Sequence, residues 1–173
     1  MKKLSIILKI ILLVLIFILI FGIVTFVINK KRVEEEKPPI PFTMVYKTLY
    51  ADGGSMECVG LGYKINLYYY DSILSEPQTI YEIGDYNLKF DKDKNKPLII
   101  RLSEIFFDYY YDLGNDPRTE EENKIMKQKF NECYEKYIKI YGINTKSDEK
   151  IEKVIKDYFG LDDSYKLYEN KSY

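Results

Sequence analysis

The sequence of 173 residues contains no histidine and no tryptophan, only two cysteines and a single alanine. Without histidine the chain cannot supply Ser-His-Asp or Cys-His catalysis, a histidine-bearing zinc site or an imidazole pH switch. Two cysteines cannot form a four-thiolate metal site. These absences exclude many common enzyme designs, and we expect no metal site and no cofactor.

Charge is distributed unevenly along the chain. Six of the 26 basic residues precede residue 33 and all 27 acidic residues follow it, so residues 33–173 carry 20 positive and 27 negative charges, a net of −7. An acidic surface repels a phosphate backbone. We therefore expect no nucleic-acid partner.

One long apolar run is present near the amino terminus. Residues 10–28 contain no charge and would span about 28 Å as a helix, close to the ~30 Å of a bilayer core. A cleaved signal peptide would have a shorter apolar region followed by small residues, which this run lacks. We predict a transmembrane anchor over residues 1–32 that includes basic flanks on both sides of the apolar run, namely Lys2, Lys3 and Lys9 before the run and Lys30, Lys31 and Arg32 after it.

The orientation of this anchor is less strongly specified, because lysine and arginine are almost equally frequent on its two flanks. We favour an amino terminus inside the cell, since the short basic tail is typical of a signal anchor. The folded part would then lie outside. The alternative is the reverse topology, with a cytoplasmic regulatory domain tethered to the membrane.

The composition after the anchor predicts a linker and one α+β domain. Residues 33–41 combine a charge run with three prolines, which favours an extended spacer that lifts the domain off the bilayer. We place an acidic domain at residues 42–160, because about 120 residues suit one core. A polar tail follows at residues 161–173.

The first half of this domain has the alternation and aromatic content of strands. We expect an antiparallel sheet of about three or four strands. Its strands are predicted at residues 42–50, at residues 62–70 with an early start near Glu57 and a bulge near Gly60, at residues 79–83 and at residues 86–90. A charged loop at residues 91–97 would end the sheet.

The second half has the three- and four-residue apolar spacing of helices. We predict one helix over residues 98–113, for which a buried strand over 98–102 is the alternative. A second is predicted over residues 120–141 with Gly142 as its cap, and a third after Ser147 or Asp148 up to Gly160. The strands come first and the helices after, which is typical of an α+β fold.

The two cysteines are 75 positions apart, and they are a candidate disulfide. Cys58 lies near a strand and Cys133 on the apolar stripe of a predicted helix. If the domain is outside the cell, a bond between them would join the sheet to the helices. The alternative is two buried, reduced thiols that pack as small apolar groups.

Tyrosine is abundant, and Tyr68 and Tyr70 are our candidate binding residues. Exposed tyrosines offer flat faces with a polar tip, which favours them at recognition surfaces. The sheet face that carries these two side chains would be the contact face. The alternative is that the 18 tyrosines fill the core, in a composition shaped by AT-rich codons.

Other patterns point to no defined chemistry. The glycines of Asp52-Gly-Gly-Ser55 and Gly60-Leu-Gly62 lack the lysine of a phosphate-binding loop and indicate turns. The acidic set Asp108, Asp112 and Asp116 lacks the spacing of a calcium loop. Acidic residues are plentiful, yet nothing selects one carboxylate pair for hydrolysis.

The segment Tyr50-Ala-Asp-Gly-Gly-Ser-Met-Glu-Cys-Val-Gly-Leu-Gly-Tyr-Lys64 resembles part of uncharacterised small single-pass membrane proteins of low-GC Gram-positive bacteria. Those proteins pair an amino-terminal hydrophobic helix with similar Asp-Gly-Gly-Ser and Gly-Leu-Gly-Tyr-Lys stretches. The resemblance implies a bacterial membrane protein and brings no activity or site residue with it.

The sequence as a whole favours binding over catalysis. We expect a single-pass membrane protein whose domain lies outside the cytoplasm and contacts a cell-envelope or protein partner. Two alternatives remain open, a cell-envelope hydrolase that uses a carboxylate pair and the membrane-tethered cytoplasmic regulatory domain.

Overall fold

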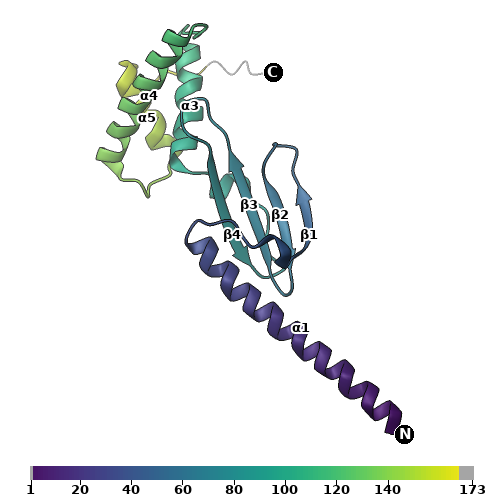
Figure 1. Ribbon diagram of the computed structural model, residues 1–173. Helices are drawn as coiled ribbons and strands as arrows, with labels where there is room; N and C mark the ends of the chain where they lie inside the picture. The colour runs from purple at the N-terminus through teal and green to yellow at the C-terminus, as the bar shows by residue number, and fades with distance from the viewer. Residues whose placement is uncertain (1, 168–173) are drawn as a thin grey trace. The chain divides into compact units, whose positions relative to one another are not determined.

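The computed structural model describes residues 2–167, and the side chains from Ile6 onward. The chain forms two compact units (Figure 1). Unit 1 contains the residues up to Tyr69 together with Thr79–Asn95, and unit 2 contains Tyr70–Gln78 and the residues from Lys96 onward. The predicted α+β class is confirmed, because a long apolar helix is followed by a four-stranded antiparallel sheet and then by helices.

Helix α1 (Lys2–Glu34) begins unit 1 and includes the whole apolar run. It ends in a tight turn in which the Lys37 amide donates to the Arg32 carbonyl over 2.8 Å. The Arg32 side chain then donates to the Pro38 carbonyl, also over 2.8 Å. The prediction of an extended spacer at residues 33–41 is therefore wrong, because this segment folds back on the end of the helix.

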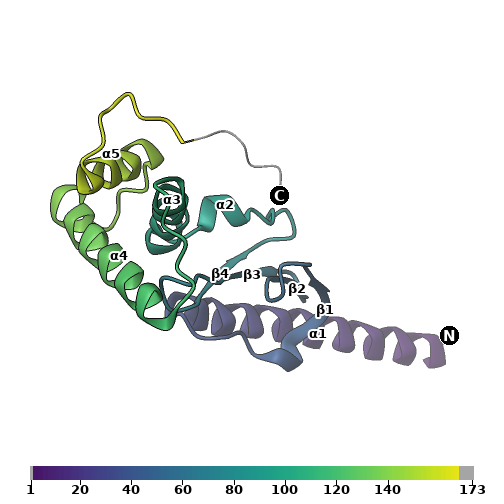
Figure 2. The same ribbon diagram turned by 90° about the horizontal axis from the view of Figure 1, so that it is seen from above.

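The sheet of unit 1 has the strand order β1-β2-β3-β4 (Figure 2). Its elements are a short 3-10 helix η1 (Pro41–Thr43), β1 (Met44–Leu49), β2 (Met56–Gly60), β3 (Lys64–Tyr70) and β4 (Gln78–Gly84). The β1–β2 hairpin pairs Leu49 with Met56, which in turn pairs with Leu67 on β3. Between β1 and β2 the Asp52 carboxylate accepts the amides of Gly54 and Ser55, as the turn composition predicts.

Two details of the predicted sheet differ from the structure. Residues 57–70 form two strands rather than one bulged strand, because the Gly60 amide donates to the Tyr63 carbonyl and closes a turn. The predicted strand at residues 86–90 is absent. Its place is taken by a turn in which the Leu88 amide donates to the Asp85 carbonyl, followed by a four-residue helix, α2 (Lys92–Asn95).

Unit 2 consists mainly of three helices, and their predicted positions are confirmed. They are α3 (Leu98–Asp112), α4 (Glu120–Tyr141) and α5 (Asp148–Phe159). Helix α4 begins with a capping box in which Thr119 and Glu122 satisfy each other's backbone amides. Helix α5 ends at Gly160, whose φ of 67° is the left-handed conformation that favours glycine.

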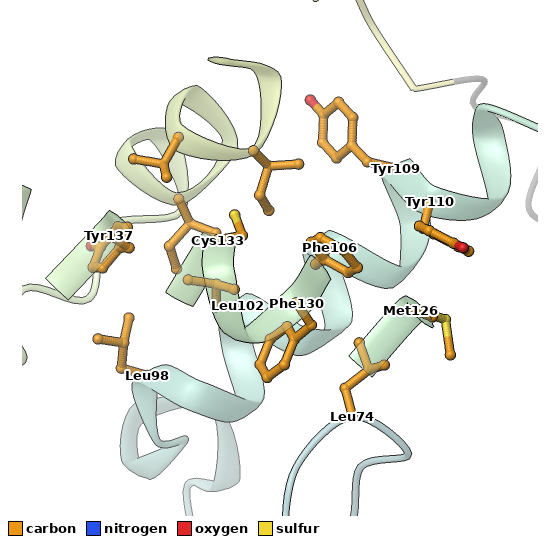
Figure 3. Packing of buried hydrophobic residues seen from close by; sticks show 13 residues of the cluster. Leu74, Leu98, Leu102, Phe106, Tyr109, Tyr110, Met126, Phe130, Cys133 and Tyr137 are labelled. Atoms are coloured by element: carbon orange, nitrogen blue, oxygen red, sulfur yellow. The ribbon is translucent and has the colours of Figure 1, made fainter. Parts of the chain in front are cut away.

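The core of unit 2 is built from the apolar faces of these helices (Figure 3). Phe106 of α3 meets Phe130 of α4 edge to face, with ring centroids 5.7 Å apart. The fully buried members of this core are Leu102, Phe106, Met126, Phe130, Cys133, Tyr137, Ile151 and Ile155. Burial of each such side chain contributes about 1.5–3 kcal/mol, so this cluster holds the three helices together.

Candidate functional site: the junction of α1 and the sheet

Helix α1 has two different surfaces along its length. From Ile6 to Phe21 its apolar side chains are 36–69% exposed, and they surround the helix. Beyond that point Gly22, Thr25 and Asn29 are buried. Their spacing of three and four places them on one helix face. This stripe lies against the sheet of unit 1, so α1 is a structural part of that unit as well as a long apolar helix.

Asn29 is the centre of the junction, and its side chain is completely buried. Its amide nitrogen donates to the Tyr63 hydroxyl over 2.8 Å and to the Thr43 hydroxyl over 2.9 Å. Its amide oxygen accepts the Ile40 backbone amide over 2.9 Å. Asn29 thus joins α1 to the chain reversal, to η1 and to the residue that precedes β3.

Close backbone and ring contacts surround this hydrogen-bonded centre. The Phe26 and Tyr63 rings lie 5.7 Å apart. A Cβ atom on Gly60 would lie 2.3 Å from the Tyr63 ring, and one on Gly22 would lie 2.7 Å from the Leu61 carbonyl oxygen. Both glycines are therefore required by the close approach of neighbouring groups.

A second polar centre lies within unit 1 around Tyr68. Its hydroxyl donates to the Glu82 carboxylate over 2.7 Å and accepts from the Asn66 side chain over 3.1 Å. Burial raises the pKa of this phenol, and the neighbouring Glu82 raises it further. The buried Asn66 side chain also donates to the Lys89 carbonyl, and it ties the segment after β4 to the sheet.

The prediction that Tyr68 and Tyr70 form an exposed contact face is wrong. Tyr68 is 0% and Tyr70 is 3% exposed. The Tyr68 ring lies 4.7 Å from the Phe90 ring, which covers it. The alternation of β3 did not reveal this, because both faces of the strand are buried, each over a different part of its length. Ile65 is buried on one face, and Tyr68 and Tyr70 are buried on the other.

The predicted disulfide between Cys58 and Cys133 is not formed, and both residues are free, buried thiols. The reason is that each belongs to the core of a different unit. Cys58 packs with Tyr63 and Ile65 in unit 1, whereas Cys133 packs among the helices of unit 2. Burial raises the pKa of the Cys133 thiol to about 12, so it is protonated at neutral pH.

Charged side chains form mainly local salt bridges and hydrogen bonds within each unit. In unit 1 the Lys92 ammonium donates to the Asp52 carboxylate over 2.5 Å. Burial raises the pKa of this carboxyl, but hydrogen bonds from Lys92 and Ser55 outweigh it and hold the pKa below its usual range. The salt bridge therefore fastens the turn between β1 and β2 to the start of α2.

Asp112 and Asp116, two members of the acidic set noted in the sequence, take part in separate contacts in unit 2. Asp112 accepts the Tyr165 hydroxyl over 2.6 Å, and Asp116 forms a 2.7 Å salt bridge with Arg118. Across residues 2–167 there is no group of three or more cysteine, aspartate or glutamate side chains placed to hold a metal ion.

Comparison with family models, with curated proteins and with solved structures finds no match. The site is therefore defined by its geometry alone. Our sequence reasoning missed Asn29, although it is the only residue between the apolar run and the basic flank. A polar residue seven positions after the single glycine of an apolar helix is the signal that could have identified it.

Proposed function

We propose that this protein is a single-pass membrane protein whose folded part lies outside the cytoplasm and binds a partner polypeptide through strand β1. Helix α1 is long and apolar enough to cross a membrane. Its apolar side chains from Ile6 to Phe21 are exposed all round, and each would gain part of the roughly 1.5–3 kcal/mol that full removal of such a side chain from water contributes. A bilayer supplies that environment, which supports the anchor.

The orientation in this proposal is supported by the lysines in the first turn of α1. Lys2 and Lys3 lie in this turn, before the apolar run, as in a signal anchor that keeps its amino terminus in the cytoplasm. Residues 33–173, with their net charge of −7, would then follow on the outer side. The partner is accordingly a protein of the cell envelope.

The observation that carries the binding proposal is the exposed apolar edge of the sheet. Strand β1 is at the end of the strand order and pairs only with β2 in the described residues (Figure 1). Val45 is 68% and Leu49 is 72% exposed on this strand. A shift of register between Met44 and Tyr46 leaves Val45 without a partner on β2 and turns Tyr46 outward as well.

An extended strand of another polypeptide is the occupant that fits this edge. The free side of an edge strand presents a row of backbone donors and acceptors, and only another extended backbone matches that row. Val45 and Leu49 are four positions apart, so alternating apolar side chains of the added strand can pack beside them. The backbone would provide affinity and the apolar side chains selectivity.

The orientation is tested with an introduced cysteine. Asp163→Cys lies at an exposed position, whereas the two native thiols are buried, and we expect them not to react in the folded protein. We expect a membrane-impermeant maleimide to label this variant in intact cells, while a cytoplasmic thiol control stays unlabelled. Labelling that requires permeabilised cells would overturn the outside orientation.

The binding surface is tested with a photo-crosslinking residue at Val45, and with the same residue at Ile125, which is also exposed but lies on α4. We expect Val45 to crosslink one polypeptide and Ile125 not to do so. Leu49→Lys should abolish the crosslink, whereas Ile125→Lys should leave it intact. If the β1 amides are no better protected from hydrogen exchange in the complex than in the free protein, strand addition is excluded.

A further inference from the structure

An apolar groove of about 550 Å³ lies inside unit 1, between α1 and the turn that joins β2 to β3. One wall is formed by α1 residues between Leu15 and Phe26, and the other by Leu61 and Gly62. No charged side chain lines it. Because Gly22 is at its floor, the Leu61 backbone approaches the helix closely and shapes the groove.

The position of the groove along α1 places it at the depth of a bilayer leaflet. The interval from Leu15 to Phe26 corresponds to about 16 Å of helix, close to the ~15 Å of hydrocarbon in one leaflet. The basic residues Lys30, Lys31 and Arg32 follow within two turns and mark the headgroup level. The groove therefore opens toward acyl chains, provided that α1 spans the bilayer as proposed above.

The turn that forms the outer wall has hydrogen bonds suited to such a depth. The Gly60 amide donates to the Tyr63 carbonyl over 2.9 Å, and the Gly62 amide donates to the Tyr86 hydroxyl over 2.6 Å. The Tyr86 hydroxyl donates in turn to the Gly60 carbonyl over 3.0 Å. In hydrocarbon each unpaired backbone group would cost several kcal/mol, so these partners allow the turn to approach it.

Tyr86 also indicates where the boundary lies. Its hydroxyl is bound to the turn, yet the residue is 57% exposed. Tyrosine is enriched at the level of the headgroups, where an amphipathic ring meets both water and lipid. The exposed part of the Tyr86 side chain would therefore suit the headgroup level.

We propose that this groove binds one acyl chain of a phospholipid and that the tip of the β2–β3 turn, which contacts α1 at Gly22, lies in the outer part of the hydrocarbon. The chain packs along α1 from Leu15 to Phe26 and contacts Leu61 on its other side. Unit 1 thus holds a lipid between its membrane helix and its sheet, which fixes the height of the sheet above the bilayer.

The test uses the full chain in vesicles of phosphatidylcholine and phosphatidylglycerol that contain phosphatidylcholine with a diazirine on its acyl chain. After irradiation, peptides are assigned by mass spectrometry. We expect labels on Leu61 as well as on α1. Labels on Leu12 and Leu13 with none on residues 60–62 would overturn the groove while supporting the membrane span, and no label on α1 would overturn the span itself.

Two tryptophan variants separate the groove from general exposure to lipid. Ile18 lines the groove, whereas the adjacent Phe17 does not and is more exposed. Ile18→Trp should lower labelling of Leu61 by about threefold or more, because the larger side chain fills the space. Phe17→Trp should leave that labelling unchanged. Equal labelling of both variants, or crosslinks from Leu61 to a second copy of the chain, would overturn the proposal.

Discussion

The Asn29 side chain donates a 2.8 Å hydrogen bond to the Tyr63 hydroxyl, which joins the apolar helix to the sheet of unit 1. The two residues are 34 positions apart, and both are completely buried. A contact of this kind fixes the direction in which the helix leaves the sheet. An anchor on a free linker would have no such constraint.

Removal of this contact should loosen the junction. Asn29→Ala leaves the Ile40 amide and the hydroxyls of Thr43 and Tyr63 without their buried partner, and we expect a loss of about 2–4 kcal/mol of stability in unit 1. The measurement is hydrogen exchange of the Ile40 amide in the full chain in nanodiscs. That amide should exchange faster in the variant.

Asn87→Ala is the matched control, because Asn87 is exposed on the turn after β4. It should leave the exchange of Ile40 unchanged. If Asn29→Ala had no more effect than this control, α1 would behave as an independent anchor and the junction would contribute nothing to the fold.

Tyr68 should contribute to stability rather than to recognition. Tyr68→Phe deletes the hydroxyl that bonds to Glu82 and Asn66 in the interior of unit 1, at an expected cost of about 1–3 kcal/mol. Urea unfolding of the full chain in detergent measures this loss. Tyr46→Phe, at an exposed position on β1, should change stability by less than about 0.5 kcal/mol. Equal midpoints for the two variants would contradict a structural role.

The parts of the fold that could be predicted are those with a local signal. Helix α4 was predicted at residues 120–141 because an acidic first turn, a long apolar stripe and the capping Gly142 follow one another along the sequence, as in a helix from start to end. Strands β1, β3 and β4 were located approximately for the same reason, whereas β2 was merged with the strand that follows it. Each element contains the pattern that defines it.

The remaining features depend on contacts between distant residues. The alternation of β3 cannot show that its two faces are covered at different ends. That covering comes from distant residues, since Phe26 packs on Tyr63 and Phe90 packs on Tyr68. The same limit applies to the segment at residues 86–90. Tyrosine is enriched in strands, which made Tyr86 part of a predicted strand, but its hydroxyl is bound to the turn at Gly60 and Gly62.

The buried thiols should be reduced and unreactive in the folded protein. We expect no maleimide on Cys58 or Cys133 in the native full chain, because both are buried and burial raises the pKa of each thiol. After denaturation without a reducing agent, mass spectrometry should show two maleimides per chain. A denatured chain that takes up maleimide only after reduction would instead contain the disulfide.

Stability should fall at alkaline pH because of the same burial. The Cys133 thiol has a pKa of about 12 in the folded chain against an ordinary value of 9.0, so the unfolded chain loses this proton first. The contribution of the protonated Cys133 thiol to the free energy of unfolding is complete below pH 9. It is lost between pH 9 and pH 12, at about 1.4 kcal/mol per pH unit. Tyr109, whose pKa burial also raises to about 12, steepens the same decline.

Two variants in the core of unit 2 separate this effect from loss of packing. Cys133→Ala removes the titrating group, so the free energy of unfolding should decline with a shallower slope above pH 9 than in the original chain. Met126→Ala removes a fully buried side chain from the same core without a titrating group, and it should lower stability by about 2–5 kcal/mol at every pH with no change of slope. Urea unfolding from pH 7 to pH 11 measures both slopes. Parallel curves for all three proteins would show that the Cys133 proton is not linked to folding.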